Sequence, residues 1–328
     1  MRKKCLISAA VLFFLTAAAY GSGREPGTPL HEAVIANDIE KVRQLLDEGA
    51  DVNIRTPYSK QTPLHWSVWQ SDIAIMNLLI ERGADVEARD SNEMTPLHLL
   101  STSQKKERAG ALLCLLGEGA QVNTVDKFGA SPLHIAAHNN SADFVKILLE
   151  HGADIEMKQE EYGTTPLFTA VLSWKPGVES MAVLIGHGAD VNARDETLRT
   201  PLFYAVTRAD AERLVFLLEK GADINAQAND GETPLHNAVM QDDLVLAEIL
   251  IGAGARINSR DSWGQTSLHR AVYYGKGKAV DLLIRRGADP NLADNKGKKP
   301  LDIAREKNAF GRISKEILDL LKPLTVSK

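Results

Sequence analysis

A four-residue motif recurs at a nearly constant spacing through most of this chain. Most copies read Thr-Pro-Leu followed by His or Phe, and the nine copies begin at Thr28, Thr62, Thr95, Ser131, Thr165, Thr200, Thr233, Thr266 and Lys299. Their successive spacings are 34, 33, 36, 34, 35, 33, 33 and 33 residues. A period of this length predicts a stack of similar supersecondary units, in which each unit buries its apolar face against its neighbours.

A glycine, usually followed by Ala-Asp, forms a second marker in phase with the first. It occurs at Gly49, Gly83, Gly119, Gly152, Gly188, Gly221, Gly254 and Gly287. Threonine caps a helix N-terminus, proline fits the first helical position, and glycine suits a left-handed residue after a helix. The two markers therefore predict two helices per repeat, one beginning at the Pro and the other ending just before the Gly.

Two motifs locked to one period of about 33 residues resemble the ankyrin repeat. The resemblance implies an all-α solenoid of about nine helix-turn-helix repeats joined by β-hairpin loops, with no linker between domains. It covers residues 24–322, and residues 323–328 form a C-terminal tail. The resemblance also implies that the histidines of the motif bond the backbone between neighbouring repeats.

Residues 1–19 have the features of a secretory signal peptide. Three basic residues, Arg2 to Lys4, precede an apolar run at 6–19, and small residues stand at Ala17 and Ala19. The run is too short to span a bilayer. We therefore expect cleavage after Ala19 and an exported chain, periplasmic or secreted and of bacterial source, without membrane insertion. Cleavage after Gly21, an uncleaved anchor and a eukaryotic secretory protein are the alternatives.

The charge and the motifs that are missing restrict the chemistry. The formal net charge is −5 and no basic stripe is present, which argues against nucleic-acid binding. The sequence contains no G-x-S-x-G, H-E-x-x-H, paired C-x-x-C or Walker-type phosphate loop. Because the repeated histidines are structural by resemblance, we expect no metal, no cofactor and no catalytic residue.

Ankyrin proteins usually bind through the concave surface formed by the loop tips and the exposed side of the first helices. On that surface the resemblance places residues that follow the small-residue pair of each first helix, and of these Trp69, Gln70, His138, Arg208, Met240, Tyr273 and Tyr274 are candidates for partner binding. At the loop tips the candidates are the aromatic residues before a turn glycine, Phe128, Tyr162 and Trp263. Aromatic side chains bury much area at little rotamer cost. Packing of a tip aromatic on the next loop is the alternative.

Two repeats depart from the pattern between their helices. The third carries extra residues at Ser103 to Arg108, and the fifth carries Ser173 to Gly177, which includes Trp174. Both insertions are candidates for partner-specific features, and tolerated variation of surface loops is the alternative.

These observations predict a non-catalytic, monomeric protein-interaction module that acts outside the cytoplasm. One alternative is an inhibitor or immunity protein for a toxin or enzyme in the same compartment. Another is an effector released from the cell. From a different class, an enzyme or enzyme subunit is the alternative in which an insertion supplies the chemistry.

Overall fold

The computed structural model describes residues 27–70, 72–103, 108–241, 243–309 and 315–322. These residues form two compact units that meet in the sequence between Asp154 and Ile155. All regular secondary structure in the described ranges is helical, as the repeat predicts. The predicted signal peptide at 1–19, the first residues of the predicted array and the tail at 323–328 lie outside the described residues.

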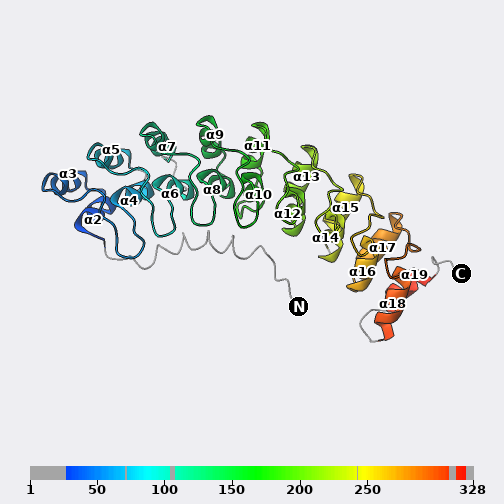
Figure 1. Ribbon diagram of the computed structural model, residues 1–328. Helices are drawn as coiled ribbons and strands as arrows, with labels where there is room; N and C mark the ends of the chain where they lie inside the picture. Colours follow the sequence, from blue (N-terminus) through cyan, green and yellow to red (C-terminus); the bar gives the residue numbers. More distant parts are fainter. Residues whose placement is uncertain (1–26, 71, 104–107, 242, 310–314, 323–328) are drawn as a thin grey trace. The chain divides into compact units, whose positions relative to one another are not determined.

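The first unit consists of pairs of short helices. The pairs are α2 (Pro29–Ile35) with α3 (Ile39–Asp47), α4 (Pro63–Gln70) with α5 (Ile73–Glu81), α6 (Pro96–Thr102) with α7 (Arg108–Gly117), and α8 (Pro132–His138) with α9 (Ala142–Glu150). First helices contact first helices from α2 to α8 and form one layer, and the second helices form the other (Figure 1). The motif leucines Leu64, Leu97 and Leu133 are fully buried in the core of this unit.

The second unit repeats the same arrangement. Its pairs are α10 (Pro166–Val171) with α11 (Glu179–Gly186), α12 (Pro201–Thr207) with α13 (Ala211–Glu219), α14 (Pro234–Met240) with α15 (Leu244–Gly252), α16 (Ser267–Tyr273) with α17 (Gly277–Arg285), and α18 (Pro300–Ala309) with α19 (Lys315–Leu321). Helix α19 contacts α17 and α18, and its Ile317 and Leu321 are fully buried. It closes the apolar end of the stack, as expected for a C-terminal cap.

The helix boundaries follow from the two sequence markers. Thr95 has extended backbone angles, φ −86° and ψ 167°, and Pro96 is the first residue of α6. After the second helices, the eight marker glycines all have φ between +86° and +99°, a conformation that costs glycine little because it has no side chain. The predicted helix starts and the predicted glycine positions after the second helices are therefore confirmed.

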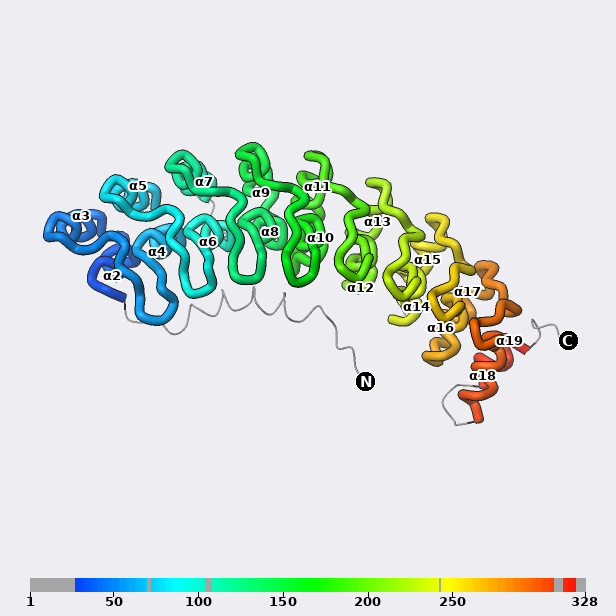
Figure 2. The backbone as a smooth tube through the Cα atoms, in the orientation of Figure 1, coloured from blue at the N-terminus to red at the C-terminus, as the bar shows by residue number. Residues whose placement is uncertain are grey.

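The loops between repeats fold back on themselves (Figure 2), and five of them turn around an aspartate. The Oδ1 atom of Asp261 accepts hydrogen bonds from the backbone N–H groups of Trp263, at 2.9 Å, and Gln265, at 2.8 Å. The same two bonds, to the second and fourth following residues, form at Asp90, Asp126, Asp195 and Asp294. The described loops contain no strand residues, so their hairpin shape comes from these turns and not from a β-ladder.

Adjacent loop tips are joined by a backbone hydrogen bond. The N–H of Ser262 donates to the carbonyl oxygen of Asp230 at 2.9 Å. Gly231 lies at this contact with φ +74°, and a Cβ atom there would stand 2.6 Å from the backbone nitrogen of Ser262. Glycine is required here by both the backbone angle and the neighbouring tip.

Five of the motif histidines link their repeat to the next. The Nε2 atom of His65 lies 3.1 Å from the carbonyl oxygen of Met94, and its Nδ1 atom lies 2.8 Å from the Thr62 hydroxyl. Because a carbonyl oxygen only accepts hydrogen bonds, Nε2 carries the proton and Nδ1 accepts from the hydroxyl and from the Thr62 N–H. The same bridge to the next repeat forms at His31, His98, His236 and His269, at 3.1–3.2 Å. The expected backbone role of these histidines is confirmed.

Two repeats replace this histidine with a fully buried phenylalanine, Phe168 or Phe203. Phenylalanine fills the same space but offers the capping threonine no nitrogen. As a result, the buried hydroxyls of Thr165 and Thr200 have no hydrogen-bond partner in the structure.

Acid should destabilise the chain through these histidines. Burial lowers the pKa of His65 to about 4 and that of His98 to about 3, from an ordinary value of 6.5. Between pH 6.5 and 4 the unfolded chain therefore binds more protons than the folded chain, and the free energy of unfolding falls as the pH falls. Urea denaturation followed by circular dichroism should show this loss. The His98→Phe variant should lose less stability over the same range, and an identical pH dependence would contradict this account.

The partnerless threonines give a matched test of the bridge. Thr200→Val removes a buried hydroxyl that bonds to nothing, so it should leave stability unchanged or slightly higher. Thr233→Val removes a hydroxyl that lies 2.8 Å from His236 Nδ1 and should cost about 1 kcal/mol. Urea unfolding midpoints measure both, and equal effects of the two substitutions would show that the hydroxyl-imidazole contact contributes nothing.

Candidate functional site

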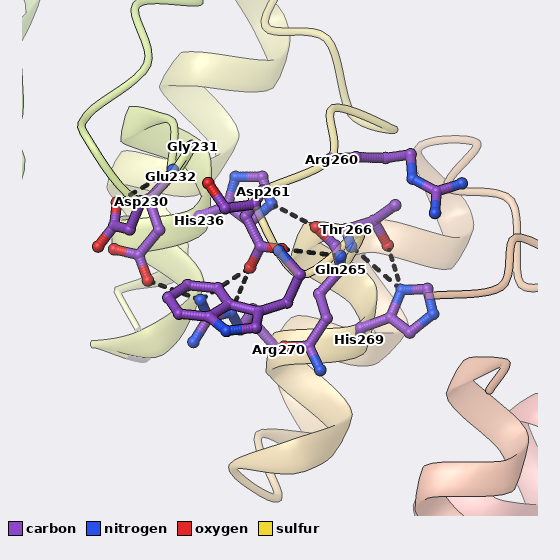
Figure 3. A network of polar contacts seen from close by, with 12 residues as sticks. Asp230, Gly231, Glu232, His236, Arg260, Asp261, Gln265, Thr266, His269 and Arg270 are labelled. Atoms are coloured by element: carbon purple, nitrogen blue, oxygen red, sulfur yellow. Dashed lines mark hydrogen bonds and ion pairs between the residues drawn. The ribbon is translucent and has the colours of Figure 1, made fainter. Parts of the chain in front are cut away.

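A buried ion-pair network connects two loop tips to helix α16 in the second unit (Figure 3). The Nη2 atom of Arg270 lies 2.7 Å from Asp261 Oδ2 and 2.9 Å from Glu232 Oε1. Its Nε atom also donates to Asp261 Oδ2 at 2.9 Å. The Asp261 side chain is fully buried, and burial raises the pKa of the Glu232 carboxyl above its usual range, although Arg270 opposes the shift. The network fixes two tips against one helix.

Trp263 lies over this network at the tip of its loop. The guanidinium carbon of Arg270 is 5.0 Å from the ring centroid, a cation–π distance, and 52% of the residue is exposed. The indole is therefore held on one side by a charged group and open to solvent on the other.

Tyr273 and Tyr274 stand at the end of the same helix. Their rings meet edge to face with centroids 5.2 Å apart, and each residue is 47% exposed. The Nζ atom of Lys307, from α18, lies 3.6 Å from the Tyr273 ring centroid. Beside Tyr273 is a pocket of about 210 Å³, which α16, α18 and the loop before α18 line together. We call Trp263, Arg270, Tyr273, Tyr274 and Lys307 the C-terminal aromatic face.

The other predicted binding residues of the second unit are less exposed. Met240 is half-buried at the end of α14, which contacts α16. Tyr162 is half-buried at a loop tip, where its hydroxyl donates to Glu161 Oε1 at 2.6 Å and this bond raises the pKa of Tyr162 to about 12. The structure thus places Trp263 against Arg270 of helix α16 and places Tyr273 and Tyr274 at the end of the same helix, whereas Tyr162 belongs to another repeat.

Arg208 has a structural contact that the sequence did not suggest. Its Nη2 atom donates to the carbonyl oxygen of Ser173 at 3.4 Å, so it helps to hold the inserted loop of the fifth repeat. Arg213 does more: it is 2% exposed, donates from Nη1 to the carbonyl oxygens of Ser173, at 3.0 Å, and Val171, at 3.3 Å, and also bonds the Lys175 carbonyl. Together the two arginines order the loop that presents the exposed Trp174.

Arg213 was missed by the sequence reasoning, although a signal existed. It follows its helix cap, Asp210, by three residues. The corresponding positions include the buried apolar residues Ile75, Phe144 and Leu246, and the first repeat has the exposed Lys41 there. A charged residue at a position that is buried and apolar in several other repeats indicates a buried polar contact. The tip aspartates were also missed, although Asp261 and its equivalents recur five residues before the motif.

The predicted residues of the first unit do not gather on one patch. Trp69 is 37% exposed on α4, and Phe128 is half-buried with Lys127 Nζ 5.0 Å from its ring centroid. The side chain of Gln70 lies outside the described part of the structure, as do residues 104–107 of the third-repeat insertion.

His138 corrects one expectation, because it is 3% exposed and does not reach the surface. The end of α8 packs against the end of α6, where Asn139 Nδ2 donates a hydrogen bond to the carbonyl oxygen of Ser101 at 3.0 Å. This contact buries the last turn of α8. The interpretation of His138 as an exposed binding residue is therefore wrong.

Within the described ranges, no group of three or more His, Cys, Asp or Glu side chains is placed to hold a metal ion. Among the same residues, none of the helices has the length and apolar composition needed to cross a membrane.

Stacked helix pairs joined by turn-forming loops define this chain as a helical-repeat protein. The family described as "Ankyrin repeats (3 copies)" matches overlapping stretches at residues 8–90, 30–114, 97–195, 175–261, 202–294 and 235–323. The chain belongs to the ankyrin-repeat family. Ankyrin repeats are in general non-catalytic domains that mediate protein–protein binding.

Similar proteins share the repeats over part of their length. Inversin of Canis lupus familiaris is 30% identical over 183 residues, which are 55% of this chain and 17% of inversin. Rabankyrin-5 of Mus musculus is 32% identical over 131 residues, 40% of this chain and 11% of that protein. The neurogenic locus Notch protein of Drosophila melanogaster is 41% identical over 96 residues, 29% of this chain and 4% of Notch. The chain thus matches less than a fifth of each of these relatives.

Substitutions of Arg270 test the ion-pair network. Arg270→Met should cost about 3 kcal/mol, because it leaves the buried Asp261 carboxylate without its cation. The sixth repeat has a tyrosine, Tyr204, at the position that Arg270 occupies in the eighth. The hydroxyl of Tyr204 donates a hydrogen bond to Asp195 Oδ2 at 2.6 Å. Arg270→Tyr should therefore cost clearly less than Arg270→Met. Thermal unfolding measures both, and an equal or reversed order would contradict the assigned role.

Proposed function

We propose that this protein is a non-catalytic interaction module that acts outside the cytoplasm and binds a protein partner through its first helices and loop tips. The observation that carries the proposal is the C-terminal aromatic face. Trp263, Tyr273 and Tyr274 are each about half exposed in the eighth repeat, Trp263 against Arg270 of α16 and the two tyrosines at the end of that helix. Large aromatic side chains that no core requires are typical of binding hot spots.

The geometry of the face favours binding in a second way. Trp263 is held against Arg270, and Tyr273 packs against both Tyr274 and Lys307. Side chains that are already held in place lose less conformational freedom when a partner binds. The face is thus prepared for contact and does not need to be ordered by it.

The leader-like residues 1–19 support an extracytoplasmic site of action. The partner is then a protein of the periplasm or the cell exterior. An inhibitor or immunity protein would use the same surface as a scaffold, so the identity of the partner distinguishes them.

Crosslinking and affinity capture from the envelope and the culture medium test this proposal. The wild-type chain should recover a specific protein, and the Trp263→Ala, Tyr273→Ala, Tyr274→Ala triple variant should lose it. The expected loss in affinity is about tenfold or more, because hot-spot aromatics each contribute more than about 1 kcal/mol.

A second triple variant provides the control. Leu113→Ala, Val215→Ala and Val245→Ala change exposed apolar residues of the second helices, and should leave capture unchanged. Circular dichroism confirms that both variants are folded. Capture by the aromatic variant at the wild-type level, or loss of capture with the control alone, would refute the proposed binding face.

A further inference from the structure

Charge is distributed unevenly along this chain. Residues 256–328 contain 16 Lys and Arg but 8 Asp and Glu, whereas residues 1–255 contain 22 Lys and Arg and 35 Asp and Glu. The net charge of −5 hides a basic C-terminal end on an acidic protein. The C-terminal aromatic face belongs to this basic end, so a partner that binds there meets a positive potential that the rest of the chain does not provide.

The pocket beside Tyr273 combines apolar and charged walls. Tyr273 and Ile303 give it apolar sides, and Lys296, Lys298 and Lys307 stand around it. Its volume of about 210 Å³ is enough for one aromatic or long aliphatic side chain, since a cavity of about 150 Å³ holds benzene. Lys298 is engaged with Glu306 at 2.7 Å. Lys296 is exposed and forms no ion pair in the described part of the chain, and Lys307 contacts the Tyr273 ring.

We propose that the C-terminal aromatic face binds an acidic peptide segment that carries one aromatic or long aliphatic side chain. The apolar side chain enters the pocket beside Tyr273, and flanking carboxylates of the segment pair with Lys296 and Lys307. This inference rests on the proposed function, to which it adds the chemical class of the partner. The lysine side chains favour a segment with carboxylates, because opposite charges attract. The apolar walls of the pocket favour one apolar side chain on that segment.

The acids in the same pocket favour a peptide over a nucleic acid. Asp294 and Glu306 line the pocket together with the lysines. Burial works in the other direction, but hydrogen bonds from the backbone N–H groups of Lys298 and Lys296 hold the pKa of Asp294 below its usual range, so it is ionised at neutral pH. A continuous phosphate backbone would be repelled by these carboxylates, whereas a peptide can place its acids against the lysines alone.

Selection from a library of random twelve-residue peptides on the full-length chain tests this inference. The selected peptides should carry a net negative charge and a Phe, Tyr, Trp, Leu or Met. Fluorescence anisotropy then gives the Kd of one selected peptide for each variant. The Lys296→Glu, Lys307→Glu double variant and the Tyr273→Ala variant should each raise this Kd about tenfold or more.

Val245→Ala is the control, because Val245 is exposed on the second helix α15 and is not part of the C-terminal aromatic face. It should leave the Kd unchanged. Thermal unfolding verifies that each variant is folded, and Tyr273→Phe, which keeps the ring, should bind nearly as well as the wild type.

Several results would overturn the inference. The peptide selection could yield no binder, or binders without enrichment in acidic residues. The Kd of the selected peptide could be unaffected by the lysine and Tyr273 substitutions. A single-stranded 20-nucleotide DNA could bind more tightly than the peptide. Sedimentation that shows self-association abolished by Tyr273→Ala would instead assign the face to a second copy of the chain. If any of these occurs while the aromatic triple variant still loses its captured protein, the proposed function stands and this partner class fails.

Discussion

The contact between a neutral imidazole and the carbonyl oxygen of the next repeat is the interaction that joins the repeats of the first unit and the last three repeats of the second. His65 shows both parts of this contact. Its Nδ1 atom accepts a hydrogen bond from the hydroxyl of Thr62, the capping residue of its own helix, and its Nε2 atom donates to the carbonyl oxygen of Met94. A single side chain thus sets the start of a helix and the distance to its neighbour. Because both nitrogens are used, the ring is committed to one tautomer and is kept uncharged by burial.

With the first helices fixed by these internal contacts, their remaining exposed positions are free to differ between repeats. In the eighth repeat this freedom produces the C-terminal aromatic face, where Arg270 is bonded to two loop tips and supports Trp263. In the fifth repeat it permits an insertion that Arg213 of the next repeat holds in place. The same scaffold therefore carries two exposed tryptophans on ordered supports, at Trp174 and Trp263.

The helices and their ends could be predicted from the sequence, because capping and chain reversal depend on local chemistry that Thr-Pro and Gly display directly. The bridging role of the histidines followed from the family resemblance. Features that depend on contacts between particular repeats were not predicted. His138 is buried where Asn139 bonds to Ser101 of the preceding repeat. Arg213 bonds to backbone carbonyl groups of the inserted loop, about 40 residues earlier in the sequence. The basic C-terminal end was visible in the sequence, but the net charge of the whole chain concealed it.

The account's central claim is that the protein meets its partner through the C-terminal aromatic face. Site-specific photo-crosslinking tests it most directly: a photoreactive phenylalanine analogue replaces Tyr273 in one variant and Val245, an exposed residue of a second helix, in another. The account predicts a discrete crosslinked adduct from position 273 in the native compartment and none from position 245. An adduct from position 245 alone, or equal adducts from both, would contradict it.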